Sequence, residues 1–227
     1  MISLHRHQLA RLTDAGWSSI LQRPWDDQAL ECLAHWTAHR LPLVVTRQPL
    51  GAISTDLVAL GLPSPARWDR RRLALQVPHS AVWRVDEFPR LSEVLALLPH
   101  SVQRPMQGLL AALDIERVVA RVFGSYGWQS ISGLAHVRPG SDLDLWVAVN
   151  GAAQADAAAH VLQAFGSNEL RLDGELVFGD GSAVAWREWI EWRAGRARAL
   201  MVKQLGGVSL QIPKTQHERP VLTEAFE

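Results

Sequence analysis

The order of apolar and polar positions predicts a mixture of short helices and strands in the first part of the chain. Leucine and tryptophan at helical spacing predict a helix over 25–40. Prolines lie at or near the ends of several apolar runs, where they favour the termination of helices. The further elements expected in this part are strands over 41–49 and 73–77 and short helices over 53–60, 91–98 and 106–113.

The second part of the chain shows a clearer alternation of strand-like and helix-like segments. The expected strands cover 117–123, 142–149 and 170–178, and the expected helices cover 125–134 and 152–165, while 183–199 runs from a short strand into a helix. Such an alternation is typical of domains that mix helices with a sheet. We therefore expect an α+β fold, with an N-terminal mixed module over residues 1–90 and a mixed-sheet domain with flanking helices over 91–227.

Composition and charge exclude several classes of protein. The 227 residues are 48% hydrophobic and 20% charged, which is the balance of a globular chain rather than a disordered or fibrous one. The 23 basic and 23 acidic residues cancel, so the chain lacks the positive excess that binding to long nucleic acid requires. Cys32 is the single cysteine, and no apolar run is long enough to span a bilayer. We expect a cytoplasmic protein without a membrane segment.

Three acidic side chains on two expected strands are the main candidates for chemistry. Asp142 and Asp144 are two residues apart, so they point to the same face of their strand. Carboxylates placed this close repel each other unless a cation joins them, and Mg²⁺ prefers such oxygen ligands. Asp173, on the next expected strand, would complete a cluster able to hold divalent ions for phosphoryl chemistry. Alternatively, Asp173-Gly174 is a hairpin turn, and Glu175 is then the third acid.

Further residues are candidates for contact with an anionic substrate. Gly124-Ser125 follows an expected strand and opens an expected helix, where unpaired backbone N–H groups favour a phosphate. Arg47 and Lys203 each lie at or near an expected strand, so each is either a phosphate ligand or an ordinary surface charge. The arginine-rich loop 67–72 is either a solvated loop or a docking surface for an acidic carrier protein.

The combined pattern resembles the polymerase-β-like nucleotidyltransferase superfamily. Its motif is Gly-Ser at the end of a strand, a helix, and then an acid-hydrophobic-acid-hydrophobic strand, which here reads Asp142-Leu143-Asp144-Leu145. The 16 residues between Ser125 and Asp142 form a longer spacer than is usual in that superfamily.

Several neighbourhoods narrow the resemblance to one family. The chain is similar to the phosphoribosyl-dephospho-CoA transferases, the holo-acyl-carrier-protein synthases of malonate decarboxylase. This likeness extends from about Arg6 to Val208. It is carried by Pro42–Gln48, Gly124–Gln129, Ser141–Leu145, Asp173–Glu175 and Trp186–Trp189.

The resemblance implies a reaction and assigns roles to the candidate residues. The donor would be 2′-(5″-triphosphoribosyl)-3′-dephospho-CoA, and the acceptor a serine of the apo acyl-carrier subunit of malonate decarboxylase, with pyrophosphate released. Asp142, Asp144 and Asp173 would be the catalytic acids and would hold Mg²⁺ or Mn²⁺. The remaining roles, in substrate binding, would fall to Gly124, Ser125, Gly127, Arg47 and Lys203.

Three alternatives stay open at this point. The first alternative is a nucleotidyltransferase that uses ATP or another nucleotide on a small molecule or protein. The second is an inactive module that binds a carrier protein. The third is a transferase that serves a related carrier system such as that of citrate lyase. The donor accepted by the protein would separate the first alternative from the family reading.

Overall fold

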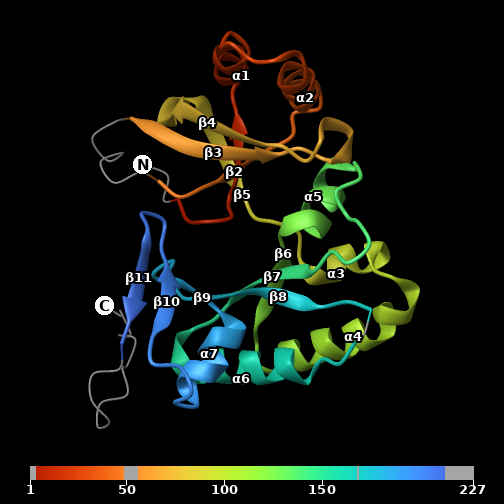
Figure 1. Ribbon diagram of the computed structural model, residues 1–227, viewed down its shortest axis with the longest axis vertical. Helices are drawn as coiled ribbons and strands as arrows, with labels where there is room; N and C mark the ends of the chain where they lie inside the picture. The colour runs from red at the N-terminus through yellow and green to blue at the C-terminus, as the bar shows by residue number, and fades with distance from the viewer. Residues whose placement is uncertain (1–3, 49–55, 168, 213–227) are drawn as a thin grey trace. The chain divides into compact units, whose positions relative to one another are not determined.

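The computed structural model describes residues 4–48, 56–167 and 169–212, which form two compact units. Unit 1 comprises residues 1–88, 128–138 and 205–207, and unit 2 comprises 89–127, 139–204 and 208–227. Each unit contains one sheet of the described chain (Figure 1). The protein is thus a mixed α/β chain. Each unit combines stretches that are far apart in the sequence.

Unit 1 is built on a five-stranded antiparallel sheet with the strand order β4-β3-β2-β1-β5. Its strands are β1 (Leu9–Leu12), β2 (Leu43–Val45), β3 (Leu57–Pro63), β4 (Arg72–Pro78) and β5 (Val82–Asp86). Two helices, α1 (Asp14–Leu21) and α2 (Asp27–Ala38), lie together beside this sheet (Figure 1). Thr13 and Asp26 begin them, because each side chain accepts a hydrogen bond from a backbone N–H of the first turn.

The predicted helix over 53–60 is wrong in its described part. Residues 49–55 lie outside the described residues, but Leu57 begins strand β3, which pairs along its whole length with β4. Val58, Leu60 and Leu62 are buried and alternate with more exposed positions. This period of two is that of a strand with one face in the core, and pairing with β4 overrides the local helical preference.

Unit 2 is built on a six-stranded mixed sheet with the strand order β11-β10-β9-β8-β7-β6. Its strands are β6 (Val119–Val122), β7 (Leu143–Ala148), β8 (Leu172–Val177), β9 (Ala183–Ala185), β10 (Leu200–Lys203) and β11 (Val208–Gln211). In the described residues β7 and β8 form the parallel pair, joined by helix α6 (Gly151–Ala164), and the other neighbouring strands are antiparallel. This arrangement follows from a crossover helix, which a parallel pair of strands requires.

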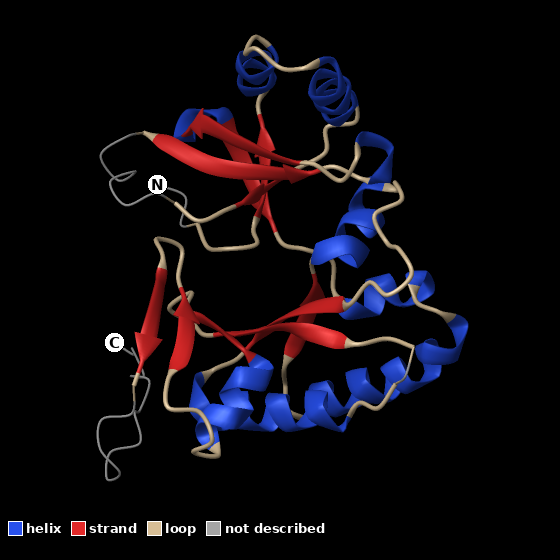
Figure 2. Ribbon diagram, in the orientation of Figure 1, coloured by secondary structure: helices blue, strands red, loops and turns tan. Residues whose placement is uncertain are grey.

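One face of this sheet is covered by three helices, α4 (His100–Ile115), α6 and α7 (Trp186–Arg193) (Figure 2). Leu145, Leu176 and Val202 are buried in the sheet, and Ala158 and Leu162 are buried on α6. The alternation of side chains along a strand therefore leaves Asp144, Glu175 and Lys203 on the other face.

Helix α4 is longer than the sequence predicts. Pro105, expected to end one helix before the next, lies inside α4. It removes one intrahelical hydrogen bond close to the start of the helix, while the buried stripe of Val102, Met106, Leu109 and Leu113 stabilises the whole length. The short helix α3 (Leu91–Val94) precedes it.

The remaining short elements connect the sheets and helices. Three turns of 3₁₀-helix, η1 (Ala66–Trp68), η2 (His79–Ala81) and η3 (Leu95–Leu97), lie in such connections. Helix α5 (Gly124–Ser132) begins in unit 2, but its residues from Trp128 onward belong to unit 1. None of the described helices has the length and apolar character needed to span a bilayer.

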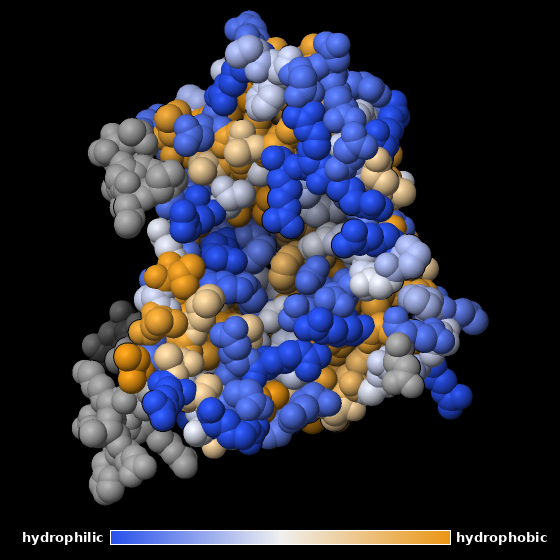
Figure 3. All heavy atoms as spheres, viewed as in Figure 1, coloured by the Kyte–Doolittle hydropathy of each residue, from blue (hydrophilic) through white to orange (hydrophobic). Residues whose placement is uncertain are grey.

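The outer edge of the second sheet is apolar on one face. Met201, Val208, Leu210 and Ile212 are exposed, and apolar surface is visible over β10 and β11 (Figure 3). The register pairs Lys203 with Val208 and Met201 with Leu210. This apolar edge therefore continues the face that carries Lys203 and the acidic side chains.

Candidate active site

Strands β7 and β8 place three predicted acids on one face of the unit 2 sheet. Asp142 directly precedes β7, Asp144 lies within it, and the parallel register sets Asp144 opposite Asp173 on β8. Leu143 and Leu145 point to the buried side, because successive side chains alternate. Buried leucines thus hold the strand in the one register that keeps both aspartates on the face opposite the helices.

Gly174 leaves no room for a side chain between β7 and β8. Its φ of +134° is one that other residues rarely adopt, and an added Cβ would lie 1.9 Å from the carbonyl oxygen of Leu145. The Gly174 N–H donates to Oδ1 of Asp173 at 2.9 Å, and both residues lie inside β8. The alternative that Asp173-Gly174 forms a hairpin turn is therefore wrong.

The Gly-Ser pair at the end of β6 lies directly against Asp144. The Phe123 N–H donates to the Asp144 carbonyl oxygen at 3.0 Å, and Gly124 follows with a φ of +61°. A Cβ on Gly124 would lie 1.9 Å from Oδ2 of Asp144. The glycine therefore makes room for the carboxylate at the start of helix α5.

The other two residues of this predicted phosphate loop differ in what they offer. Ser125 is half-buried at the start of α5, whereas Gly127 is buried and its N–H donates to the Phe123 carbonyl oxygen at 3.3 Å. The N–H of Gly127 is therefore used within the helix. Ser125 keeps a hydroxyl donor beside the helix start, where partial positive charge favours an anion.

Electrostatics single out Asp144 among the acids. Burial, and then the negative charges of Asp173, Asp142 and Glu175 in that order of importance, together raise its pKa to about 6. The side chain of Asp142 is 35% exposed and has Nη1 of Arg171 at 3.6 Å from its Oδ2. The site therefore concentrates negative charge around a poorly solvated carboxylate.

The donor set suits a divalent cation, although the side chains do not close around one. Three carboxylates on one face provide the hard oxygen ligands that Mg²⁺ and Mn²⁺ prefer. Across the described residues, no three His, Cys, Asp or Glu side chains converge tightly enough to form a complete metal site. An ion would have to draw Asp142 and Asp173 toward Asp144, and both are only partly buried.

Lys203 lies on the same face, and Arg47 belongs to the other unit. Nζ of Lys203 donates to Oε1 of Glu175 at 2.7 Å. Arg47 is exposed just after β2 in unit 1, so it is not among the residues that the unit 2 sheet brings together. The sequence did not predict the Lys203–Glu175 pair, because no local pattern reports which residues of β8 and β10 meet.

The arginine-rich loop 67–72 is partly engaged in ion pairs. Arg71 holds the Asp26 carboxylate through two nitrogens, at 2.5 and 2.6 Å. Arg67 pairs with Glu31 at 2.7 Å and lies over the Trp68 ring. Two of the four arginines are thus already paired with acids, which weakens the case for a surface that docks an acidic carrier protein here.

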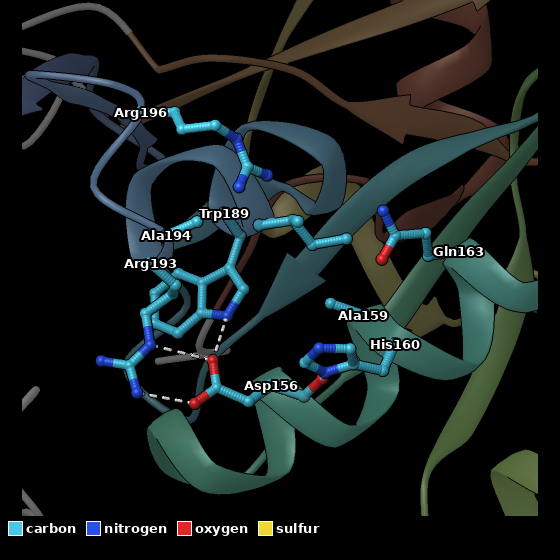
Figure 4. Close-up of a pocket in the computed structure, with 9 residues that line it drawn as sticks. Asp156, Ala159, His160, Gln163, Trp189, Arg193, Ala194 and Arg196 are labelled. Carbon is cyan, nitrogen blue, oxygen red and sulfur yellow. Dashed lines mark hydrogen bonds and ion pairs between the residues drawn. The ribbon is translucent and has the colours of Figure 1, made fainter.

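A surface pocket of about 420 Å³ lies between α6 and α7, away from the acids (Figure 4). Asp156 accepts hydrogen bonds there from Trp189 and Arg193, and Arg196 pairs with Glu191. These helices cover the opposite face of the sheet from Asp144. The pocket is therefore separate from the candidate active site, and its arginines are paired.

Two family models match successive parts of the chain. The model of the phosphoribosyl-dephospho-CoA transferase MdcG N-terminal domain matches residues 5–88, and that of the MdcG C-terminal domain matches residues 90–213. No solved structure matches the chain.

Relatives that carry the same name are similar to this chain over most of their length. A phosphoribosyl-dephospho-CoA transferase of Xanthomonas axonopodis pv. citri is 36% identical over 200 residues, which are 87% of this chain and 89% of that protein. One from Bradyrhizobium diazoefficiens is 36% identical over 206 residues (90% and 88%), and one from Pseudomonas aeruginosa is 32% identical over 161 residues (70% and 72%). The chain belongs to the phosphoribosyl-dephospho-CoA transferase family.

Proposed function

We propose that this protein transfers phosphoribosyl-dephospho-CoA from 2′-(5″-triphosphoribosyl)-3′-dephospho-CoA to a serine of the apo acyl-carrier subunit of malonate decarboxylase. The family supports the transferred group, because its members are named for it. The main support for the catalytic site is the placement of Asp144, which has Asp173 opposite it in register and Gly124 against its carboxylate. We further propose that this is a polymerase-β-like nucleotidyltransferase site.

The reaction is an in-line displacement at the α-phosphorus of the donor. The serine Oγ forms a bond to that phosphorus, the bond to the bridging oxygen of pyrophosphate breaks, and pyrophosphate leaves with the electron pair. One of the three carboxylates takes the serine proton. Mg²⁺ or Mn²⁺, held by Asp142, Asp144 and Asp173, would supply positive charge that stabilises the attacking and leaving oxygens.

The remaining residues bind and orient the donor. The start of α5 offers backbone N–H groups at Gly124 and Ser125, together with the Ser125 hydroxyl, to a phosphate. Gly127 keeps its proposed place beside this loop, but its N–H is used within the helix. Lys203 contacts the phosphates farther along the sheet, and Arg47 remains a candidate from unit 1. Such transfers depend mainly on positioning and electrostatics.

We propose that the reaction takes place in the cytoplasm, where the lone cysteine stays reduced.

The mass of the carrier subunit tests the proposal directly. Purified apo acyl-carrier subunit is incubated with the protein, Mg²⁺ and the triphosphoribosyl donor, with ATP as the donor in a parallel reaction. We expect a mass gain equal to phosphoribosyl-dephospho-CoA with the first donor alone. A gain with ATP alone would indicate a nucleotide-dependent transferase, and no gain in either reaction would favour an inactive carrier-binding module.

Substitution of Asp144 connects that activity to the site. Asp144→Asn should reduce the rate of carrier modification by several orders of magnitude and leave the fold intact, because the removed charge serves catalysis rather than the core. Asp114→Asn, an equivalent change at an exposed position of α4, is the matched control and should retain full activity. Near-normal turnover by Asp144→Asn would contradict the assignment.

A further inference from the structure

Glu175 and Lys203 form an ion pair beside the acidic row of unit 2. The Glu175 residue is only 5% exposed, and its Oε1 accepts a hydrogen bond from Nζ of Lys203 at 2.7 Å. The lysine side chain remains 29% exposed. A buried carboxylate requires such a partner, because an unpaired charge in this environment is strongly destabilising.

Strand β9 allows the pair to form across it. Glu175 lies opposite Ala185, and Lys203 lies opposite Ala183, so the two charged residues come from strands on either side of β9. The two alanines are the side chains that β9 presents on this face. The lysine stem therefore crosses the strand over small residues, where larger side chains would separate the two charges.

The register also separates the roles of Asp173 and Glu175. Asp173 lies opposite Asp144, whereas Glu175 lies opposite Trp146, farther along β7. Among the acids whose negative charge raises the pKa of Asp144, Asp173 has the largest effect and Glu175 the smallest. Glu175 is also paired with Lys203. Asp173 is thus the better placed third acid.

We propose that Glu175 is a positioning residue that holds the Lys203 ammonium beside the acidic row, to receive the terminal phosphates of a polyphosphate ester. This rests on the function proposed above. Glu175 lies two positions along β8 from Asp173, a distance of about 7 Å. A donor whose reacting phosphorus lies at Asp144 and Asp173 can therefore extend its outer phosphates toward Lys203. Held by Glu175, the flexible lysine loses little further freedom on binding.

The chain offers a selective probe of this lysine, because Lys203 and Lys214 are its two lysines. Reductive ¹³C-methylation of the full-length protein gives one dimethyl-lysine resonance for each, assigned with K203R and K214R. We expect the Lys203 resonance to be shifted from the free dimethyl-lysine value in the native protein and to collapse toward it in Glu175→Gln. Glu191→Gln is the matched control, because it breaks an exposed Glu–Arg contact of the same 2.7 Å length. A Lys203 resonance that Glu175→Gln leaves unmoved would overturn the proposal.

Tripolyphosphate is the probe that tests whether Lys203 binds phosphates. Its addition should shift the Lys203 resonance, with a dissociation constant at least fivefold weaker in Glu175→Gln than in the native protein or Glu191→Gln. Equal binding by all three proteins, or no shift of Lys203 at saturation, would contradict the role in phosphate binding. This measurement uses neither the donor nor the carrier, so it stands even if carrier modification fails.

Mn²⁺ binding, followed by the loss of the free-ion electron paramagnetic resonance signal, distinguishes a positioning residue from a metal ligand. We expect Asp173→Asn to weaken Mn²⁺ binding at least tenfold and Glu175→Gln to leave it within twofold of the native value. Equal weakening by the two changes would make Glu175 a ligand and overturn the proposal.

In the transfer reaction, Glu175→Gln should raise KM for the donor about tenfold with kcat changed less than threefold, and K203R should retain more activity than K203M. A fall in kcat at unchanged KM would also contradict the assignment.

Discussion

At the scale of single residues, Gly124 shows how little space the site leaves beside its central carboxylate. A methyl group at this position would overlap Oδ2 of Asp144 and would require a left-handed backbone conformation that costs about 1–2 kcal/mol. We expect Gly124→Ala to lose at least about a hundredfold in transfer rate, because it displaces Asp144. Gly133→Ala is the matched control, since Gly133 also has a positive φ but nothing within 4 Å of an added Cβ. It should lose similar backbone stability and keep its activity; equal rate losses would show that the backbone alone is responsible.

The pKa of Asp144 predicts a pH-dependent stability. A carboxyl group whose pKa rises from 3.8 to about 6 on folding binds its proton more tightly in the folded state. Its stabilising contribution is therefore full below about pH 4 and is lost as the pH rises through 6. At pH 7 and without divalent ions, Asp144→Asn should be more stable than the native protein by about 3 kcal/mol. Chemical unfolding in EDTA from pH 4 to pH 8 checks this, and a difference that does not vanish at low pH would contradict it.

At the scale of elements, the parallel pair β7–β8 depends on the absence of a side chain at Gly174. An added Cβ would lie 1.9 Å from the Leu145 carbonyl oxygen and 2.6 Å from its nitrogen, so the strands must separate. We expect Gly174→Ala to cost roughly 3–5 kcal/mol, from overpacking and backbone strain together. Gly179→Ala, which has open space around the added Cβ, should change the free energy of unfolding by less than about 0.5 kcal/mol. Thermal and denaturant unfolding of both variants measures the difference.

The sequence predicted most elements of unit 2, and two of its helix predictions, one in each unit, were wrong because tertiary contacts outweigh local signals. The acid-hydrophobic alternation at the start of β7 and the apolar residues at helical spacing on α4 and α6 are visible in the sequence alone. The helix expected over 53–60 failed because the pairing of β3 with β4 outweighs a weak capping signal. Pro105 was expected to end a helix, but a buried stripe on both sides of it continues α4.

At the scale of the whole molecule, unit 1 needs a segment that lies far along the chain. Trp128, on the second half of α5, packs edge-on against Phe88 at a ring-centroid distance of 5.5 Å and lies 6.4 Å from Trp36. His136, from the same returning segment, stacks on Trp128. Residues 1–88 alone, although a family model matches almost this range, lack that part of their core.

The full chain and a fragment together test this dependence. Trp128→Ala should destabilise the protein by about 3–5 kcal/mol, whereas Trp83→Ala, at an exposed position of β5, should cost less than about 0.5 kcal/mol. The fragment 1–88 should lack cooperative unfolding and resolved amide resonances. A fragment that unfolds cooperatively with native-like spectra would show that the returning segment is dispensable.

Some properties of this protein depend on near neighbours in the chain, and the sequence alone determined those. The two-residue spacing of Asp142 and Asp144 sets their common face, and the Gly-Ser pair after an apolar run sets the start of α5. The tertiary structure decided which distant groups meet: Asp173 rather than Glu175 opposite Asp144, Lys203 with Glu175 across β9, and Trp128 within unit 1. Strand register and packing between distant segments are set by the burial of whole faces, a collective property that no local spacing encodes.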